Sequence, residues 1–405
     1  MSFQTGLSGL NAASRNLDVV GNNIANANTV GAKVARAEFS QVVASATIAG
    51  GSSAGLGVEV ATVSQLFSQG NISLTGGMLD LAIEGSGFFR VTMPDGTAAY
   101  TRAGEFKLDK LGNIVTNQGA NLMGFPTTTA GVATSSTLQP LQLPTSTPIP
   151  ASATTTITAE FNLNAQAPVW NTPVPPTPLT TYGTALTTYD SQGAPITASL
   201  YMRKTANDTW AVFTDPTSNA TATATTAATL TFGTNGQLLS SVPASPTVTL
   251  TSPNPAIGTF TPVLDITLAT QFATAFAVSD LTQDGYAPGD FVKLKIGDDG
   301  VILASYSNGE DQAAGQVALA DFRNVQGLRP GPGDTWVETT ASGQPVTSAP
   351  LEGKFGSVRS GALEESNIDL TAELVNMMTA QRSYQANAQT IKTQDQVLQT
   401  LVNLR

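Results

Sequence analysis

Both ends of the chain carry apolar residues at alternating spacings of four and three, the pattern of an α-helix that buries one face along its length. Near the start, these residues are Phe3, Leu7, Leu10, Leu17 and Ile24. Near the end, they are Leu370, Leu374, Met377, Tyr384, Ile391, Leu398 and Val402. We call the two sets the terminal seams. Two long helices must therefore find partners, and this requirement constrains the fold more than any other feature.

The terminal seams leave two arrangements open. The helices can pair within one molecule as an α-helical hairpin, or their seams can meet other subunits. Asparagine and glycine have low helix propensity, so the first helix should gain its order from packing. It ends in an unusual run, in which Asn22, Asn23, Asn26 and Asn28 precede Gly31. Capping a helix takes one or two amides, so the surplus indicates an interface.

The second helix has a clear start signal. Asp369 directly precedes its seam and can cap the helix, and Glu373 lies in the first turn, where a carboxylate is favoured. The sequence therefore predicts that this helix begins at about Leu370.

The residues between the helices are typical of β-structure. Short runs rich in Val, Ile, Thr, Phe and Tyr alternate with Asp-Gly and Asn-Gly pairs, such as 95–96, 235–236 and 308–309, that favour hairpin turns. A Thr-, Ser- and Pro-rich tract at 126–158 is typical of a connector, because proline cannot donate a hydrogen bond in a central strand. The composition changes again near 281–289. These two breaks predict one β domain inserted into another.

The predicted fold class is a multidomain α+β chain, in which terminal helices form a coiled-coil-like inner domain and mainly-β outer domains are nested between them. The expected boundaries are residues 1–33 with 361–405 for the terminal α-helical domain, 34–70 for a linker, 71–145 with 281–360 for a β-rich domain, and 146–280 for the inserted outer β domain.

The composition excludes most enzyme chemistry. The chain has no cysteine and no histidine, which removes disulfides, thiolate nucleophiles, Cys/His zinc sites and histidine-dependent triads. Only 12% of residues are charged and the net charge is −11, so no basic stripe can bind nucleic acid. Ser86 in EGSGFF indicates a turn rather than a nucleophile. We expect no enzyme activity, no catalytic residue, no cofactor and no metal.

The sequence also lacks signals for membrane insertion or ordinary secretion. It contains no apolar run of about 18 residues, the length that a membrane-spanning helix needs. The segment MSFQTGLSGLNAASRN has neither the basic flank nor the apolar core of a cleaved signal peptide. We therefore expect no membrane insertion, and any export should use a route without a cleaved signal.

Several segments resemble the bacterial flagellar hook proteins, which belong to the rod-hook family of axial proteins. The run GLSGLNAASRNLDVVGNNIANANTVGAK at 6–33 is similar to the family's N-terminal signature, although the family usually has an aromatic residue where this chain has Ala32. The run from 361 to 405 is similar to the family's C-terminal segment, and the segments 189–193 and 283–310 resemble hook proteins specifically. The N-terminal motif is carried by Asn22, Asn23, Ile24, Asn26, Thr29 and Gly31.

The resemblance implies a structural subunit of the flagellar hook that polymerises into a curved, flexible, hollow tube. Such a tube is a universal joint that transmits torque from the rod to the filament. In this family both termini form the inner α-helical polymerisation domain, so the terminal seams of residues 1–33 and 361–405 would bury against each other and against neighbouring subunits. The implied partners are further copies of the chain, the rod protein, the hook–filament junction protein, the hook cap and the type III flagellar export apparatus. The implied location is the extracellular part of the flagellum.

Two alternatives are left open by the sequence. Rod and hook-associated axial proteins share the terminal motifs, so a distal rod or hook-associated protein is the first alternative. The second is a β-rich cell-surface adhesin, whose helical ends would serve only to oligomerise it.

Overall fold

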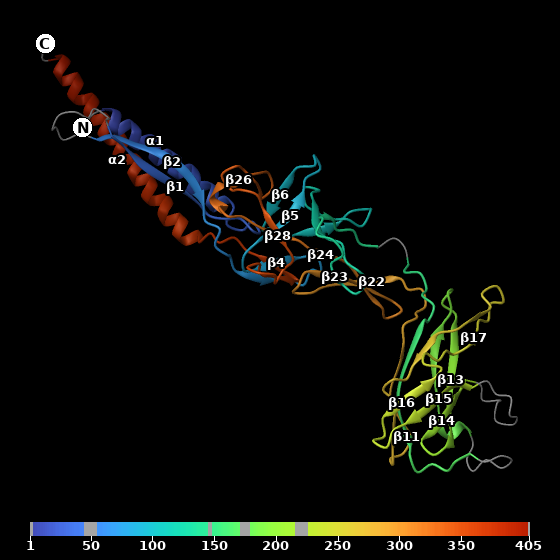
Figure 1. The fold of residues 1–405 in the computed structure, drawn as a ribbon. Coiled ribbons are helices and arrows are strands. Elements are labelled where there is room, and N and C mark those ends of the chain that lie inside the picture. Colours follow the sequence, from blue (N-terminus) through green and yellow to red (C-terminus); the bar gives the residue numbers. More distant parts are fainter. Residues whose placement is uncertain (1–2, 44–54, 145–147, 171–178, 215–225, 404–405) are drawn as a thin grey trace. The chain divides into compact units, whose positions relative to one another are not determined.

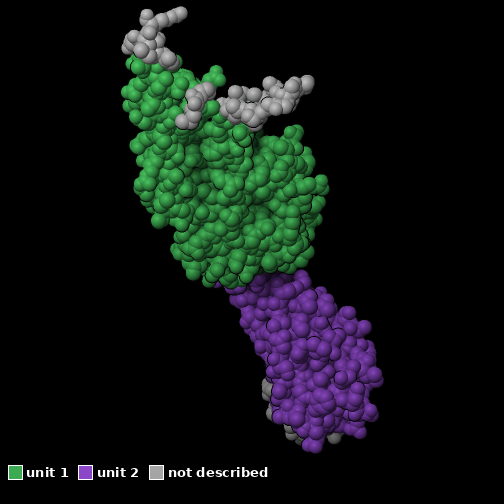
Figure 2. Space-filling view, turned by 90° about the vertical axis from the view of Figure 1, so that its left-hand side faces the viewer, with its two compact units in different colours: residues 1–146, 293–304, 311–405 green, residues 147–292, 305–310 purple. Residues whose placement is uncertain are grey.

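The structure is a computed structural model that describes residues 3–43, 55–144, 148–170, 179–214 and 226–403. The chain divides into two compact units (Figure 2). Unit 1 comprises residues 1–146, 293–304 and 311–405, and unit 2 comprises residues 147–292 and 305–310. Terminal helices flank many strands, which confirms the predicted multidomain α+β fold class with mainly-β domains between the helices.

The helices α1 (Phe3–Ala25) and α2 (Leu370–Asn403) lie side by side in unit 1 (Figure 1). Asp369 caps α2 as predicted, because its Oδ1 accepts hydrogen bonds from the backbone N–H groups of Thr371 and Ala372 at 2.9 and 3.1 Å. After α1 the chain turns at Gly31, whose φ of 72° favours glycine. Among the described residues, neither helix is long and apolar enough to cross a membrane.

The segment 34–70, expected as a linker, carries an antiparallel hairpin of β1 (Ala35–Val43) and β2 (Gly55–Gln65). The hairpin packs against α1 (Figure 1). Its strands pair Ala35 with Gln65 and Phe39 with Val60, and a shift of register separates these pairs. The alanine- and serine-rich composition of this segment did not predict strands. Whether such residues form β-structure depends strongly on the surface against which the strand packs.

The rest of unit 1 is a β domain built from both halves of the chain. Its strands β3 and β4 pair with β30 and β29, which come almost 300 residues later in the sequence. Among the described residues, the largest sheet is 13-stranded and has the main order β22-β23-β24-β9-β5-β6-β27-β26. A short 3-10 helix, η3, spans Val325–Gly327. The strands are β3 (Ile72–Leu74), β4 (Leu81–Glu84), β5 (Phe88–Thr92), β6 (Ala98–Thr101), β7 (Phe106–Leu108), β8 (Ile114–Thr116), β9 (Asn121–Phe125), β10 (Gln139–Pro140), β22 (Phe291–Ile296), β23 (Val301–Tyr306), β24 (Asp311–Val317), β25 (Leu319–Asp321), β26 (Arg329–Pro330), β27 (Thr335–Val337), β28 (Val346–Ser348), β29 (Ser357–Ser360) and β30 (Ala362–Glu364).

Unit 2 is a β domain with its own core. A meander of β12-β13-β14-β15-β16 forms one sheet, and β11 pairs with β19, β20 and β21 in a second. The Asn-Gly pair at 235–236 lies in the turn between β15 and β16, as predicted. The strands are β11 (Thr156–Asn164), β12 (Gly183–Tyr189), β13 (Pro195–Ala206), β14 (Thr209–Phe213), β15 (Thr226–Phe232), β16 (Leu238–Val242), β17 (Leu250–Thr251), β18 (Thr259–Phe260), β19 (Val263–Asp265), β20 (Thr270–Phe272) and β21 (Ala277–Gln283).

The core of unit 2 is formed by large side chains that are almost fully buried, among them Trp210, Phe161 and Leu200. Trp210 donates from its indole Nε1 to Oε1 of Gln271 at 2.9 Å, which satisfies its only polar group. The predicted connector at 126–158 lies before this core. Within its described part, the strands are the two-residue β10 and the first residues of β11.

Candidate functional site

The two terminal helices meet through small side chains. Gly6, Ala12 and Ala13 of α1 are buried, and so is Ala380 of α2. A Cβ atom added at Gly9 would lie 2.8 Å from Oδ1 of Asn387, so glycine is what lets the two backbones come this close. The helices therefore pair within one molecule, with Gly6 of α1 against Ile391 of α2 and Gly9 against Asn387.

Half of the large residues of the terminal seams stay exposed in the helix pair. Six of these side chains are between 37% and 49% exposed: Phe3, Leu7, Leu370, Leu374, Tyr384 and Leu398. Five others are half-buried: Leu10, Leu17, Ile24, Met377 and Ile391. The side chain of Val402 lies outside the described residues. The outer face of α2 carries further exposed apolar residues that the spacing did not predict: Val375, Met378 and Val397.

The asparagines at the end of α1 have separate roles. Asn23 is only 3% exposed, and its Nδ2 donates to Oε2 of Glu373 at 3.0 Å and to the carbonyl of Ala35 at 2.7 Å. Its Oδ1 accepts from the Ala35 N–H at 3.0 Å, so one amide ties α1 to both β1 and α2. Asn26 instead donates to the carbonyl and side chain of Asn22, which closes the end of α1 locally. Asn28 is exposed.

Beyond these asparagines, the motif continues into the β domain. Thr29 donates from its hydroxyl to Oδ1 of Asn26 at 3.4 Å. The N–H of Gly31 donates to the backbone carbonyl of Glu364 at 2.8 Å, which joins the N-terminal segment to the end of β30.

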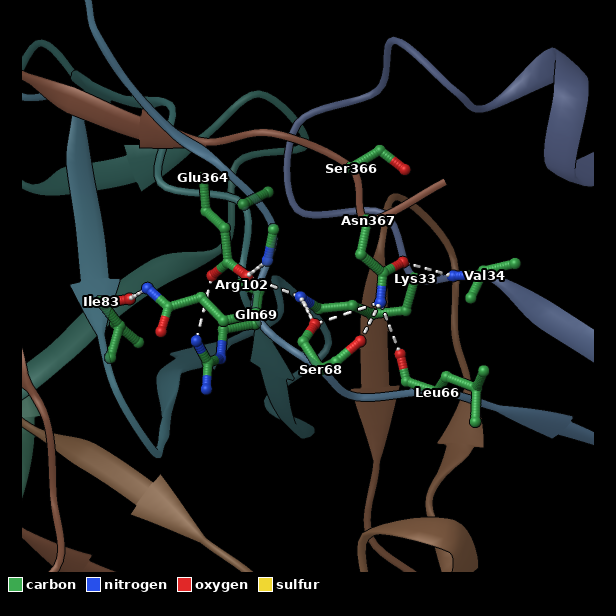
Figure 3. Close-up of polar contacts among 12 residues, drawn as sticks. Lys33, Val34, Leu66, Ser68, Gln69, Ile83, Arg102, Glu364, Ser366 and Asn367 are labelled. Carbon is green, nitrogen blue, oxygen red and sulfur yellow. Dashed lines mark hydrogen bonds and ion pairs between the residues drawn. The ribbon is translucent and has the colours of Figure 1, made fainter. Parts of the chain in front are cut away.

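A buried ion triad lies where these segments converge (Figure 3). The carboxylate of Glu364 is fully buried and receives Nζ of Lys33 at 2.6 Å on one oxygen and Nη1 of Arg102 at 3.0 Å on the other. Lys33 also donates to the carbonyl of Ser68, and Arg102 to that of Gly85, both at 2.8 Å. Burial lowers the pKa of Lys33, which the contact with Glu364 partly opposes.

This triad joins segments from distant parts of the sequence. Lys33 follows α1, Arg102 follows β6, and Glu364 ends β30. Removing one member of such a group leaves an uncompensated charge away from water, which is costly. The triad could not be predicted from the sequence, because nothing local marks a glutamate that is 331 positions from Lys33 and 262 positions from Arg102. The only available signal was the scarcity of charged residues in the chain.

Asn367 joins the hairpin to the start of α2 (Figure 3). Its Oδ1 accepts from the Val34 N–H at 2.8 Å, and its Nδ2 donates to the carbonyls of Leu66 and Ser68 at 2.9 and 3.1 Å. At the base of β2, Oε1 of Gln65 accepts from Nε1 of Trp336 at 2.6 Å. The hairpin is thus attached at both of its ends to the segments around it.

These contacts position structural elements and join them to one another. In the described part of the chain, no cluster of three or more aspartate or glutamate residues could hold a metal ion. The arrangement holds two helices, a hairpin and a β domain in fixed positions relative to one another, and it leaves apolar side chains exposed.

Comparisons with known proteins agree on one family. Four family models match: "Flagella basal body rod protein" over residues 3–33, "Flagellar hook protein FlgE/F/G D1 domain" over 82–162, "Flagellar basal body protein FlaE D2 domain" over 162–286, and "Flagellar basal body rod FlgEFG protein C-terminal" over 359–404.

Relatives that match over their full length are described as flagellar hook proteins. The flagellar hook protein FlgE of Escherichia coli (strain K12) is 42% identical over 420 residues, which cover 100% of both chains. FlgE of Rhizobium meliloti (strain 1021) is 34% identical, over 100% of this chain and 98% of its own. The crystal structure of Helicobacter pylori flagellar hook protein FlgE2 shares the fold, with a TM-score of 0.53 at 16% identity, over 72% of this chain and 100% of that one.

Proposed function

The chain belongs to the flagellar hook protein family, and we propose that it works in the hook through its paired terminal helices. It is a structural subunit of the flagellar hook and not an enzyme. It polymerises with copies of itself, in the part of the flagellum that lies outside the cell.

The observation that carries the mechanism is the outward direction of the seam residues. Six large apolar side chains of α1 and α2 are left between 37% and 49% exposed in a single subunit. Burying a side chain of this kind contributes roughly 1.5–3 kcal/mol, and somewhat less where it starts half-buried. Contacts with neighbouring subunits would recover this free energy. We therefore assign the terminal seams as the subunit-packing surface.

A heterologous contact explains how such packing yields a tube. When the face that one subunit offers differs from the face it receives, the assembly continues instead of closing, and a helical polymer results. In the proposed polymer, the helices form the inner wall and the β domains lie outside. The tube is curved and flexible because contacts between low-charge outer surfaces can slide, whereas buried ion pairs would resist leaving register. It would act as a universal joint between rod and filament.

The domain boundaries form part of the same proposal. Residues 1–33 with 361–405 make the inner domain, 71–145 with 281–360 the β-rich domain, and 146–280 the inserted domain. The segment 34–70 joins the first two and adds the hairpin to the inner helices. The contacts of Asn23, Asn367 and Glu364 support this scheme, because they fasten the helices, the hairpin and the β domain together.

Further partners follow from the position of a hook in the flagellum. We propose that the polymer meets the rod protein at one end and the hook–filament junction protein at the other. The hook cap and the flagellar export apparatus would act during growth, with export that needs no cleaved signal peptide. The terminal segments support this proposal, because they are similar to those of rod proteins and could therefore pack with a rod subunit as they pack with each other. The proposal includes no nucleic acid and no membrane insertion.

Immunogold electron microscopy with an antibody against unit 2 tests the proposal on intact and detergent-stripped cells. We expect label on a short curved tube at the base of the filament. Label that appears only after the envelope is removed, on a straight axial segment, would favour a distal rod protein. Label scattered over the cell surface would favour an adhesin.

A further inference from the structure

A groove of about 940 Å³ lies between α1, the β1–β2 hairpin and α2. Its floor is formed by small side chains, among them Ala12, Ala13 and Ala380. The hairpin side carries larger apolar residues: Phe39, Val58 and Leu66. Phe39 and Leu66 are 43% and 39% exposed, although they line a concave surface. An apolar groove of this size, open in the single subunit, indicates an occupant.

The outer face of α2 offers a matching ridge at its beginning. Leu370, Leu374, Val375 and Met378 are between 45% and 53% exposed there. Leu370, Leu374 and Met378 are spaced four residues apart, so they lie in one row along the helix. Glu373 and Ala380, which contact or line the groove side, are buried on the opposite part of the helix surface. The ridge, which is residues 370, 374, 375 and 378, therefore cannot fill the groove of its own subunit.

We propose that the groove receives the ridge of a second copy of this chain. The inference rests on the proposed function, because a polymer of this chain must join a surface to a different surface on its neighbour. Groove and ridge are both apolar and lie on different faces of the same helix pair. A volume within the roughly 300–1,000 Å³ range of ligand pockets accommodates several apolar side chains. The proposed contact joins the start of α2 in one subunit to the groove beside the hairpin of the next.

The absence of cysteine allows a direct test by cross-linking. We would make the single-cysteine variants Val58→Cys in the groove and Leu374→Cys in the ridge, mix them, assemble tubes and oxidise. Mass spectrometry of the digest should then find a disulfide-linked peptide pair that contains positions 58 and 374. The same mixture kept monomeric should yield at least tenfold less of it. Leu370→Cys and Met378→Cys repeat the test along the ridge, so that one unfavourable disulfide geometry does not decide it.

A steric block tests the groove by a second route. Thr379 lines the groove, and its hydroxyl bonds only to a carbonyl of its own helix, so Thr379→Trp should fill the groove without disturbing other contacts. Thr393 makes the same kind of bond on α2 and does not line the groove, which makes Thr393→Trp the matched control. We expect Thr379→Trp to raise the concentration needed for tube formation at least tenfold, and Thr393→Trp to change it less than twofold.

The outcomes separate the inference from the proposed function. If the unmodified chain forms no tubes, the proposed function fails. If tubes form but none of the three ridge positions links to position 58, or if Thr379→Trp assembles as well as Thr393→Trp, the groove–ridge contact is overturned while the proposed function stands. A third outcome is that an apolar dye binds saturably to assembled tubes and that Thr379→Trp removes this binding. It would assign the groove to a small ligand and also overturn the contact.

Discussion

The helix pair and unit 2 bury their side chains in opposite ways. In unit 2, Trp210, Phe161 and Leu200 point inward and are at most 2% exposed. In the helix pair, glycine and alanine point inward, while Leu374 and Leu7 are 46% and 44% exposed. Unit 2 thus completes its hydrophobic core within one chain. The helices keep much of their apolar surface for a contact that one chain does not provide.

This difference teaches which part of the molecule couples folding to assembly. Isolated helices gain most of their stability from tertiary packing, and α1 is rich in residues of low helix propensity. Subunit contacts should therefore order the helices, whereas unit 2 should be equally folded in the subunit and in the polymer.

The largest expected effect comes from placing a charge on the outer face of α2. Leu374→Asp should abolish tube formation, because the new carboxylate would lose its water inside the subunit contact. The unfolding transition of unit 2 should not change. Electron microscopy of assembly reactions checks the first expectation and calorimetry the second. Leu239→Asp is the matched control, since Leu239 is an exposed leucine of unit 2. Normal tubes from Leu374→Asp would contradict the claim that the helices, unlike unit 2, complete their packing through subunit contacts.

The next largest effect is expected from the buried ion triad, which joins the segment after α1 to the β domain of unit 1. Glu364→Gln removes the buried carboxylate shared by Lys33 and Arg102, and the cost of breaking a buried ion pair is about 3–5 kcal/mol. Backbone amides should exchange their hydrogens faster throughout unit 1 than in the unmodified chain, and the exchange rates of unit 2 should not change. Glu365→Gln alters an exposed neighbour that bonds to Asn71 and should have little effect. Equal behaviour of the two variants would contradict the role given to the triad.

A core substitution in unit 2 tests the comparison from the other side. Leu200→Ala should lower the free energy of unfolding of unit 2 by about 2–5 kcal/mol, because the side chain is fully buried. At temperatures where unit 2 stays folded, tubes should still form. Denaturant unfolding measures the first effect and sedimentation of polymers the second. Loss of assembly without unfolding would show that unit 2 contributes to the contacts that hold the polymer together.

The smallest effect depends on pH. Burial, and then the charge of Glu105, raise the pKa of Asp334 above the ordinary value of 3.8. The ionised carboxylate therefore costs stability above its raised pKa, and this cost disappears as the pH falls towards 3.8. Asp334→Asn should raise the melting temperature of unit 1 at pH 7, with a gain that shrinks on acidification. Asparagine also tolerates the φ of 55° at this position.

The control for this prediction has the opposite sign. Side-chain and backbone hydrogen bonds from Thr97 lower the pKa of Asp95, so its contribution is present above 3.8 and is lost as the pH falls further. Asp95→Asn should therefore lower the melting temperature at pH 7. A pH-independent difference between Asp334→Asn and the unmodified chain would contradict the assignment.

Local signals in the sequence predicted the features that local physics determines. The cap at Asp369, the turn at 235–236 and the helices at both ends depend on residues close together in the chain. The hairpin of β1 and β2 was missed, because its strands owe their formation to packing against α1. The triad was missed because Lys33 and Glu364 are 331 positions apart.

The terminal seams illustrate a subtler limit. Their spacing predicted an apolar face on each helix but could not tell which part of that face turns inward. The choice depends on how closely two backbones can approach, and Gly9 against Asn387 permits an approach that leucine would prevent. On α1 the inner contact is therefore made by glycine and alanine, and the assignment of the larger exposed residues to subunit packing stays a prediction.

The central claim is that the helices complete their packing only in the polymer, while unit 2 is complete in the subunit. Hydrogen exchange of the monomer and of assembled tubes, followed by mass spectrometry, tests it most directly. We predict that amides of α1 and α2 exchange at least a hundredfold more slowly in tubes, whereas amides of β13 and β14 exchange equally in both states. Protection of α1 and α2 in the monomer that matches their protection in tubes would contradict the claim.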